Sequence, residues 1–300
     1  MTQELQIGFV GLGAMGLPMA SNILKAGFVL HAYDVRPEPL EVIRSRGGIP
    51  CFSAREVASQ SDVVLTMLPD SNSVEQAILG PGGIAEASRD GLVLIEMSTT
   101  SLDTIRKVNQ GILESGGHVL DAPLSGVPDS AERAELTFIV GGVEGIVEQC
   151  RPVLLAMGNK VIRTGDVGSA RLAKFVNNML VTVNMLSSME ILAWARRAGA
   201  DHDAMVEVVR NGMAYSKVFD YHASSLSTRK EGYLQQHIWL HKDLRLLLEE
   251  AEAMGSALPL TAQAKQLLHS ARNMSGGAET IGALMSFFDT VAGNEGKAAK

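Results

Sequence analysis

The chain has 300 residues, enough for two domains of ordinary size, and 46% of them are hydrophobic, as a large core requires. Its 26 Lys and Arg residues against 33 Asp and Glu residues give a net charge of -7, which argues against nucleic-acid binding. No apolar run is long enough to span a bilayer, so no membrane partner is expected. Cys51 and Cys150 lack metal-ligand spacing, and with no secretory leader pattern they favour a reducing, cytoplasmic location.

The first strong pattern is a strand followed by a glycine-rich turn. Residues 5–10 are typical of a short buried strand, and an apolar helical pattern begins at Leu17. Between them, three glycines have G-x-G-x-x-G spacing, which in this context predicts a turn that binds the pyrophosphate of a dinucleotide. The alternative is a glycine turn in some other α/β protein. The candidate cofactor-binding residues of this turn are Gly11, Leu12, Gly13, Ala14, Met15 and Gly16.

A second apolar strand, Val29–Tyr33, ends in Asp34, close to the expected distance of about 20 residues past the glycines. A carboxylate at this position can accept hydrogen bonds from both ribose hydroxyls of NAD and would repel the 2′-phosphate of NADP. Arg36, two residues later, could instead bind that phosphate or point to solvent. We expect NAD as the cofactor, with NADP possible.

Strands and helices then alternate through the first half of the chain, which predicts an α/β fold with a doubly wound Rossmann-type sheet. Polar or special residues follow several strands, at Leu68-Pro69, Ser98-Thr99 and Ser125-Gly126. Because ligands bind at the carboxyl ends of such strands, these stretches and the glycine turn should meet at one crevice. The expected helices span 37–46, 54–59, 73–79, 101–115 and 145–157, and the further strands 63–67, 92–97, 119–120, 136–140 and 161–163.

The pattern changes near Gly165. A long helix, apolar on more than one face, is expected over 169–197, followed by helices over 202–211, 238–254, 260–269 and 281–291. We therefore divide the chain into a dinucleotide-binding Rossmann domain over 1–164 and an all-α domain over 165–300. The long helix would join them, and the second domain would serve substrate binding and oligomerisation.

Two lysines on these helices have more than one interpretation. Lys174 and Asn178 share a helix face at i, i+4, which suits an acid/base with its partner, although an interdomain lysine reaching solvent explains the spacing too. Lys242 beside Asp243 could equally be an ordinary helix-end charge pair. His237 and His241 also lie at i, i+4, but no third ligand accompanies them, so no metal site is predicted.

The chain resembles the β-hydroxyacid dehydrogenases, which include 3-hydroxyisobutyrate dehydrogenase and tartronate semialdehyde reductase and belong with the 6-phosphogluconate dehydrogenase-like enzymes. The resemblance covers nearly the whole chain. Its motifs are GFVGLGAMG at 8–16, PMA at 18–20, DAPLSG at 121–126, AKFVNN at 173–178 and HKDL at 241–244.

This resemblance implies a role for particular residues. Lys174 would be the catalytic acid/base, with Asn178 beside it at the substrate. Ser125 and Gly126 would hold the substrate carboxylate, with Val127 beside them. The implied cofactor contacts beyond the glycine turn are Leu68, Pro69, Thr99 and Lys242.

The chain departs from the family pattern in the segment that follows Ser125 and again around residues 276–283, where the C-terminal signature of the family is blurred. Val127 replaces the second glycine of a usual Ser-Gly-Gly, which adds bulk where substrate should bind. The usual Gly-Ala-x-x-Gly-Thr-Leu becomes SAERAEL at residues 130–136. These changes affect the prediction of the substrate more than that of the reaction.

The expected activity is hydride transfer between NAD(P) and a small 3-hydroxy acid or its semialdehyde, like that of 3-hydroxyisobutyrate dehydrogenase. One alternative is a reductase of the same scaffold that acts on tartronate semialdehyde, succinic semialdehyde or an imine. Another is a non-catalytic dinucleotide-binding sensor. The apolar helical half suggests a homodimer or homotetramer.

Overall fold

The computed structural model describes residues 5–228 and 240–294 and divides into two compact units, Met1–Lys174 and Phe175–Lys300. The break between the units falls inside the long helix α8 (Ser169–Arg197), whose bounds are those expected from the sequence. The sequence-based domain boundary lies ten residues earlier. The start of the expected helix over 238–254 and His237 lie outside the described residues.

The first unit is built on one sheet with strand order β3-β2-β1-β4-β5-β6-β8-β7, and β9 pairs with β8. The six strands from β3 to β6 are all parallel, in the doubly wound order of dinucleotide-binding folds. This confirms the predicted fold class. The strands are β1 (Gln6–Val10), β2 (Val29–Tyr33), β3 (Ile49–Pro50), β4 (Val63–Thr66), β5 (Val93–Glu96), β6 (His118–Asp121), β7 (Leu124–Ser125), β8 (Leu136–Gly141) and β9 (Gly158–Gly165).

The sheet departs from simple alternation at its β6 edge. There β8 runs antiparallel to both β6 and β7, with Asp121 opposite Gly141 and Leu124 opposite Phe138. Through Ala122 and Pro123, β7 continues in the direction of β6 along the same partner strand. The chain reverses only after β7, over residues 126–135, so β8 returns antiparallel to both.

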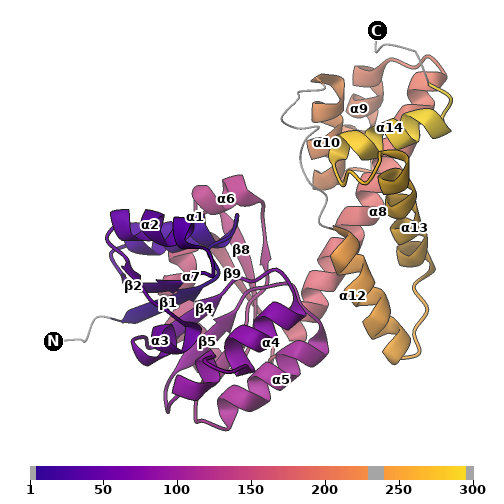
Figure 1. Cartoon of the computed structure of the whole chain (residues 1–300). Coiled ribbons are helices and arrows are strands. Elements are labelled where there is room, and N and C mark those ends of the chain that lie inside the picture. Colours follow the sequence, from indigo (N-terminus) through magenta and orange to yellow (C-terminus); the bar gives the residue numbers. More distant parts are fainter. Residues whose placement is uncertain (1–4, 229–239, 295–300) are drawn as a thin grey trace. The chain divides into compact units, whose positions relative to one another are not determined.

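Helices cover both faces of this sheet, with α1, α2 and α7 on one face and α3, α4 and α5 on the other (Figure 1). Ser101 caps α5 by accepting a hydrogen bond from the backbone N–H of Thr104 through its side-chain oxygen. The helices are α1 (Gly16–Lys25), α2 (Pro37–Ser45), α3 (Ala54–Ser59), α4 (Ser71–Leu79), α5 (Leu102–Leu113), α6 (Pro128–Glu132) and α7 (Glu144–Met157), with a 3₁₀ turn, η1, at Ile84–Ala87.

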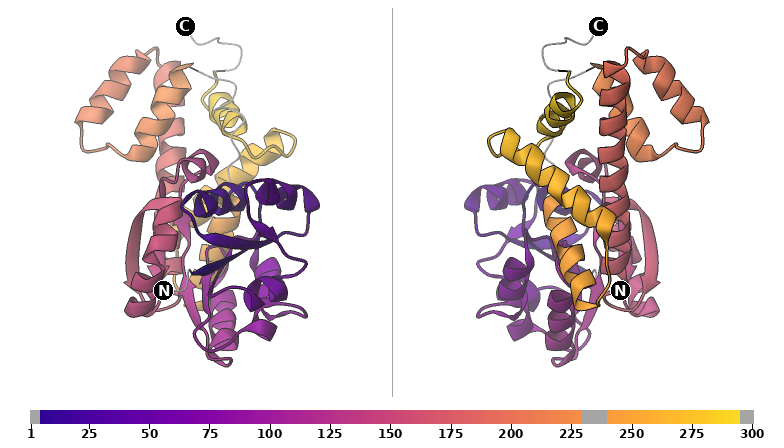
Figure 2. Two further views of the ribbon diagram at one scale, coloured as in Figure 1. Left: turned by 90° about the vertical axis from the view of Figure 1, so that its left-hand side faces the viewer. Right: turned by 90° about the vertical axis from the view of Figure 1, so that its right-hand side faces the viewer.

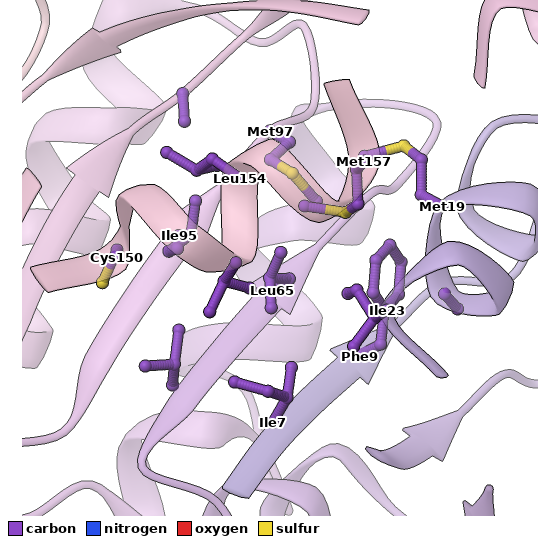
Figure 3. Close-up of a cluster of buried hydrophobic side chains, with 14 of the residues drawn as sticks. Ile7, Phe9, Met19, Ile23, Leu65, Ile95, Met97, Cys150, Leu154 and Met157 are labelled. Atoms are coloured by element: carbon purple, nitrogen blue, oxygen red, sulfur yellow. The ribbon is translucent and has the colours of Figure 1, made fainter. Parts of the chain in front are cut away.

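The core of the unit lies between the sheet and the pair α1 and α7 (Figure 3). Phe9, Leu65 and Ile95 are register partners on β1, β4 and β5, so their side chains point to the same face. Residues of α1 and α7, among them Met19 and Leu154, pack over them. This packing holds the carboxyl ends of β1, β4 and β5 side by side.

The second unit, which contains α8 from Phe175 onward, is helical. Beyond α8 its helices are α9 (His202–Asn211), α10 (Lys217–Thr228), α12 (Leu240–Ala253), α13 (Pro259–Met274) and α14 (Ile281–Val291). Helices α12 and α13 pack side by side, as the right-hand view of Figure 2 shows, and α14 packs on α13. Sequence reasoning did not predict α10. None of the helices within the described ranges combines the length and apolarity that a membrane span needs.

Candidate active site

The glycine turn joins β1 to α1, and its three glycines meet different surroundings. Gly11 has φ 95°, and a Cβ there would lie 2.4 Å from the carbonyl oxygen of Met67. A Cβ on Gly16 would lie 1.9 Å from the carbonyl oxygen of Gly11. A Cβ on Gly13 would meet no atom within 4 Å. Gly11 and Gly16 are therefore required for packing within the protein, whereas Gly13 faces open space.

That open space fits a dinucleotide. The N-cap residue of α1, Met15, makes no side-chain hydrogen bond to the first turn, and the first turn contains no acidic residue. The amino end of a helix attracts phosphate through its N–H groups and its partial positive charge. The residues present thus suit a pyrophosphate beside Gly13, as the family fingerprint requires.

Asp34 follows β2 and is buried, and its carboxylate is held by the same turn. Oδ2 accepts a hydrogen bond of 2.7 Å from the backbone N–H of Leu12, and Oδ1 accepts one of 2.9 Å from that of Arg36. Burial on its own would raise the pKa of Asp34, but the hydrogen bonds from Arg36 and Leu12 lower it overall. The carboxylate is therefore ionised at neutral pH and is fixed beside the glycine turn.

Arg36 does not point to solvent, as the sequence reasoning allowed. Its Nε donates to Asp34 Oδ1 at 3.0 Å, and its Nη2 reaches Asp34 Oδ2 and the Leu12 carbonyl oxygen, both at 3.2 Å. The guanidinium thus covers the carboxylate oxygens that ribose hydroxyls would use. Because the Arg36 side chain is 55% exposed, it can leave this position at little cost.

The next two strand ends are joined to each other. Beyond β4, the backbone N–H of Leu68 donates to Ser98 Oγ, beyond β5, at 2.8 Å. Thr99 beside it is half-buried, and Pro69 is exposed. The predicted meeting of these two stretches near the glycine turn therefore agrees with the geometry, since Gly11 also packs on Met67.

Ser125 ends β7 and is half-buried, and Gly126 follows at φ 151°, where a Cβ would lie 2.5 Å from Leu136 Cδ2. Val127 is 54% exposed, and its φ of -118° and ψ of 170° are extended values that a β-branched residue adopts readily. Replacing glycine by Val127 therefore costs no backbone strain and places an apolar side chain in the open.

Ala134 lies where the family pattern has a second glycine and adopts φ 53°. Within residues 5–228 and 240–294, no other non-glycine residue has a positive φ. The left-handed conformation favours glycine, so this alanine keeps the turn of the family pattern under some strain.

Lys174 lies in the second turn of α8 and is half-buried. Its Nζ donates a 2.8 Å hydrogen bond to the carbonyl oxygen of Leu124, the residue before Ser125. The structure thus brings the predicted acid/base next to the predicted carboxylate-binding segment.

One turn earlier, Arg171 is fully buried with two carboxylates at the ends of β5 and β6, Glu96 and Asp121. Sequence reasoning missed Arg171 and Glu96. The available signal was a charged residue at the end of each apolar strand and an arginine in an apolar helical stretch.

In the second unit, the amide of Asn178 is held on both sides. Its Nδ2 donates to Asp243 Oδ2 at 2.5 Å, and its Oδ1 accepts from Asn177 Nδ2 at 2.9 Å. Asp243 is buried on α12, and Lys242 beside it is half-buried. The Lys242-Asp243 pair is therefore more than a charge pair at a helix end, because Asp243 orients the Asn178 side chain.

Within the described parts of the chain, no three His, Cys, Asp or Glu side chains cluster as metal ligands would. His241 lies in α12, whereas His237 lies outside the described residues.

Comparisons with known proteins agree with the geometry. The family model for the NAD binding domain of 6-phosphogluconate dehydrogenase matches residues 6–165. The model for the NAD-binding domain of NADP-dependent 3-hydroxyisobutyrate dehydrogenase matches residues 168–288. The chain belongs to the β-hydroxyacid dehydrogenase family. The resemblance found in the sequence is confirmed.

Members of this family are similar to the chain over almost its whole length. The 2-(hydroxymethyl)glutarate dehydrogenase of Eubacterium barkeri is 34% identical over 98% of each chain. The 2-hydroxy-3-oxopropionate reductase of Escherichia coli is 32% identical over 97% of this chain and 99% of its own. The structure of Mycobacterium tuberculosis 3-hydroxyisobutyrate dehydrogenase with L-serine has a TM-score of 0.86 at 28% identity, covering 96% of this chain and 99% of its own. The chain is an NAD(P)-dependent oxidoreductase of this family.

The surroundings of the glycines lead to opposite expectations for two alanine substitutions. Gly13→Ala should leave the melting temperature unchanged but weaken NADH binding at least tenfold, because the methyl group enters the space where the pyrophosphate binds. Gly16→Ala should destabilise the ligand-free protein, because its Cβ overlaps the Gly11 carbonyl. Thermal unfolding without ligand and NADH fluorescence titration test both. Unchanged NADH affinity in a folded Gly13→Ala variant would contradict the cofactor position.

Proposed function

We propose that the protein interconverts a small 3-hydroxy acid and its semialdehyde, with Lys174 as general acid and base. The observation that carries this proposal is the hydrogen bond of Lys174 Nζ to the Leu124 carbonyl, which holds the ammonium beside Ser125. The family membership supports the same reaction class.

The proposed proton transfer balances in both directions. In reduction, Lys174 donates a proton from its ammonium to the carbonyl oxygen of the semialdehyde as the carbonyl carbon receives a hydride. In oxidation, the Lys174 amine accepts the hydroxyl proton of the hydroxy acid. A bound nicotinamide supplies or accepts the hydride. Lys242 would lie beside that ring, and Leu68, Pro69 and Thr99 would line the cofactor.

The substrate carboxylate would be held by Ser125 Oγ and the backbone N–H of Gly126. Asn178, one helical turn beyond Lys174, would donate to or accept from a substrate oxygen. The exposed Val127 side chain would exclude bulk near the carboxylate and so select among 3-hydroxyisobutyrate, tartronate and succinic semialdehyde substrates. An imine reductase would need a proton donor but no site for a substrate carboxylate. A non-catalytic sensor would need neither a proton donor nor a carboxylate site.

Removing Lys174 tests the assignment. Lys174→Ala should lower kcat by about 100- to 10,000-fold, because general acid-base catalysis typically contributes that much. The affinity for NADH should stay within about threefold, since the glycine turn is untouched. Turnover of short semialdehydes and of a cyclic imine, measured by NADH consumption, gives the result.

Lys107→Ala is the matched control, because the ion pairs of Lys107 with Glu75 on α4 and Asp103 on α5 lie at the surface and the variant should keep full activity. A Lys174→Ala variant with more than about a tenth of the wild-type kcat would refute the assignment. A wild-type protein that binds NADH but turns over no substrate in the panel would instead be a sensor.

We propose NAD as the preferred cofactor because Asp34 is ionised and fixed at the end of β2, where it would repel a 2′-phosphate. Arg36 must leave Asp34 before ribose hydroxyls can use both carboxylate oxygens. Exposed ion pairs are worth about 0–1 kcal/mol, so this competition costs at most about fivefold in affinity.

The kcat/KM with NAD should therefore exceed that with NADP by about 10- to 100-fold, which needs only about 1.4–2.8 kcal/mol. Arg36→Ala should lower the KM for NAD by up to about fivefold and keep or widen the preference. Asp34→Ala should reduce the ratio of kcat/KM with NAD to kcat/KM with NADP. Steady-state kinetics with both cofactors test these values, and a wild-type preference for NADP would mean that Arg36 outweighs Asp34.

A homodimer or homotetramer is also proposed. Leu180, Ile191 and Trp194 lie on one face of α8, and each residue is more than half exposed. An apolar stripe of this kind usually meets another chain. Sedimentation should give a mass at least twice the 32.0 kDa of the chain, and a monomer at micromolar concentration would contradict the proposal. The two buried free cysteines fit a cytoplasmic location.

A further inference from the structure

The first turn of α8 is fastened to the sheet by a buried cluster of charges. Arg171, Glu96 and Asp121 each have 0% side-chain exposure. Arg171 donates through Nη2 to Glu96 Oε2 and through Nη1 to the carbonyl oxygen of Ser98. Its Nε lies 2.7 Å from Asp121 Oδ1 in ion-pair contact. One guanidinium therefore joins the ends of β5 and β6 to the helix.

The two carboxylates also hold backbone groups of the same region. Asp121 Oδ2 accepts hydrogen bonds from the backbone N–H groups of Gly168 and Arg171, at 3.1 and 3.2 Å. Glu96 Oε1 accepts one from Ser98 at 2.9 Å. The cluster has two acids and one base, and the amino end of the 29-residue α8 offsets the excess negative charge. Burial raises the pKa of Asp121, although Arg171 acts against that rise.

The cluster lies one helical turn from Lys174, about 4.5 Å along the helix axis. Asp121 and Leu124 lie three residues apart in one short segment. Arg171 and Lys174, their partners on α8, are also three residues apart. The segment therefore holds the helix at two points, through Arg171 to Asp121 and through Lys174 to the Leu124 carbonyl. Any tilt or slip of the first turn would move the Lys174 ammonium away from Ser125.

We propose that Arg171, paired with Glu96 and Asp121, is a positioning residue that aims Lys174 at the reacting oxygen by fixing the first turn of α8 on the ends of β5 and β6. This inference rests on the proposed function of Lys174. The hydrogen bonds of the cluster end on Ser98 and on the start of α8 and not on the glycine turn, so its loss should lower proton transfer more than cofactor binding.

The test compares Arg171→Met with Arg171→Lys in the full chain. Arg171→Met should lower kcat about 100-fold, the usual effect of a displacement of about 1 Å, with NADH affinity within about threefold of wild type. Arg171→Lys keeps the positive charge, so its kcat should be about tenfold higher than that of Arg171→Met. In parallel, the acetylation rate of Lys174, measured by mass spectrometry, should rise several-fold in Arg171→Met.

Arg89→Met is the matched control, because Arg89 also holds the sheet but at the amino-terminal side of β4. It donates to the carbonyl oxygens of Ala58 and Ser61 at 3.0 and 2.8 Å. Its loss should lower the melting temperature and leave both kcat and the acetylation of Lys174 unchanged.

Glu96→Gln replaces Arg171→Met if the latter fails to fold. It keeps the shape and the hydrogen bond from Ser98 but puts an amide in place of the charge facing Arg171, so kcat should fall about tenfold. The inference is overturned if a folded Arg171→Met or Glu96→Gln variant keeps kcat within threefold, or if kcat and NADH affinity fall together. Failure of the proposed function is a separate result, because it would show as full activity in Lys174→Ala. The acetylation rate of Lys174 does not depend on turnover, so it tests the positioning by Arg171 on its own.

Discussion

The carboxyl edge of the sheet depends on one buried ion cluster. Glu96 and Asp121 end neighbouring strands as register partners, and without Arg171 two desolvated carboxylates would face each other. Removing one partner of a buried ion pair costs about 3–5 kcal/mol, a large part of the 5–15 kcal/mol that stabilises a typical domain. The first turn of α8 is therefore held firmly on the ends of β5 and β6.

Asp34 and Arg36 also form a carboxylate–guanidinium ion pair, but this pair can open at little cost. Its guanidinium is more than half exposed, so separating the two groups leaves both in contact with water and costs little. Arg36 can therefore exchange with a ligand hydroxyl, whereas Arg171 cannot exchange with anything. Burial decides which ion pair belongs to the framework and which can open during binding.

The sequence predicted what depends on neighbouring residues. The strand–glycine turn–helix, the carboxylate at the end of β2 and the bounds of α8 follow from local patterns and agree with the structure. The strand at residues 136–140 was predicted, but the antiparallel direction of β8 was not, because strand direction leaves no trace in hydrophobic periodicity. The Arg171 cluster was not predicted either, because it joins residues 75 and 50 positions apart. The role of Lys174 came from family resemblance, since its spacing alone also suited an exposed lysine.

Two departures from the family pattern, Val127 and Ala134, lie in the segment that follows Ser125, and the geometry explains why they are tolerated there. Val127 has an extended backbone that suits a β-branched residue, and Ala134 accepts a positive φ in the turn before β8. Asn22 of α1 holds this segment by donating to the Ala131 carbonyl oxygen at 2.7 Å, so α6 keeps its position whatever side chains flank it. Backbone contacts therefore fix the path of the segment, and its exposed side chains are left to vary. Side chains of this segment can therefore change without disturbing the buried charges that hold the first turn of α8.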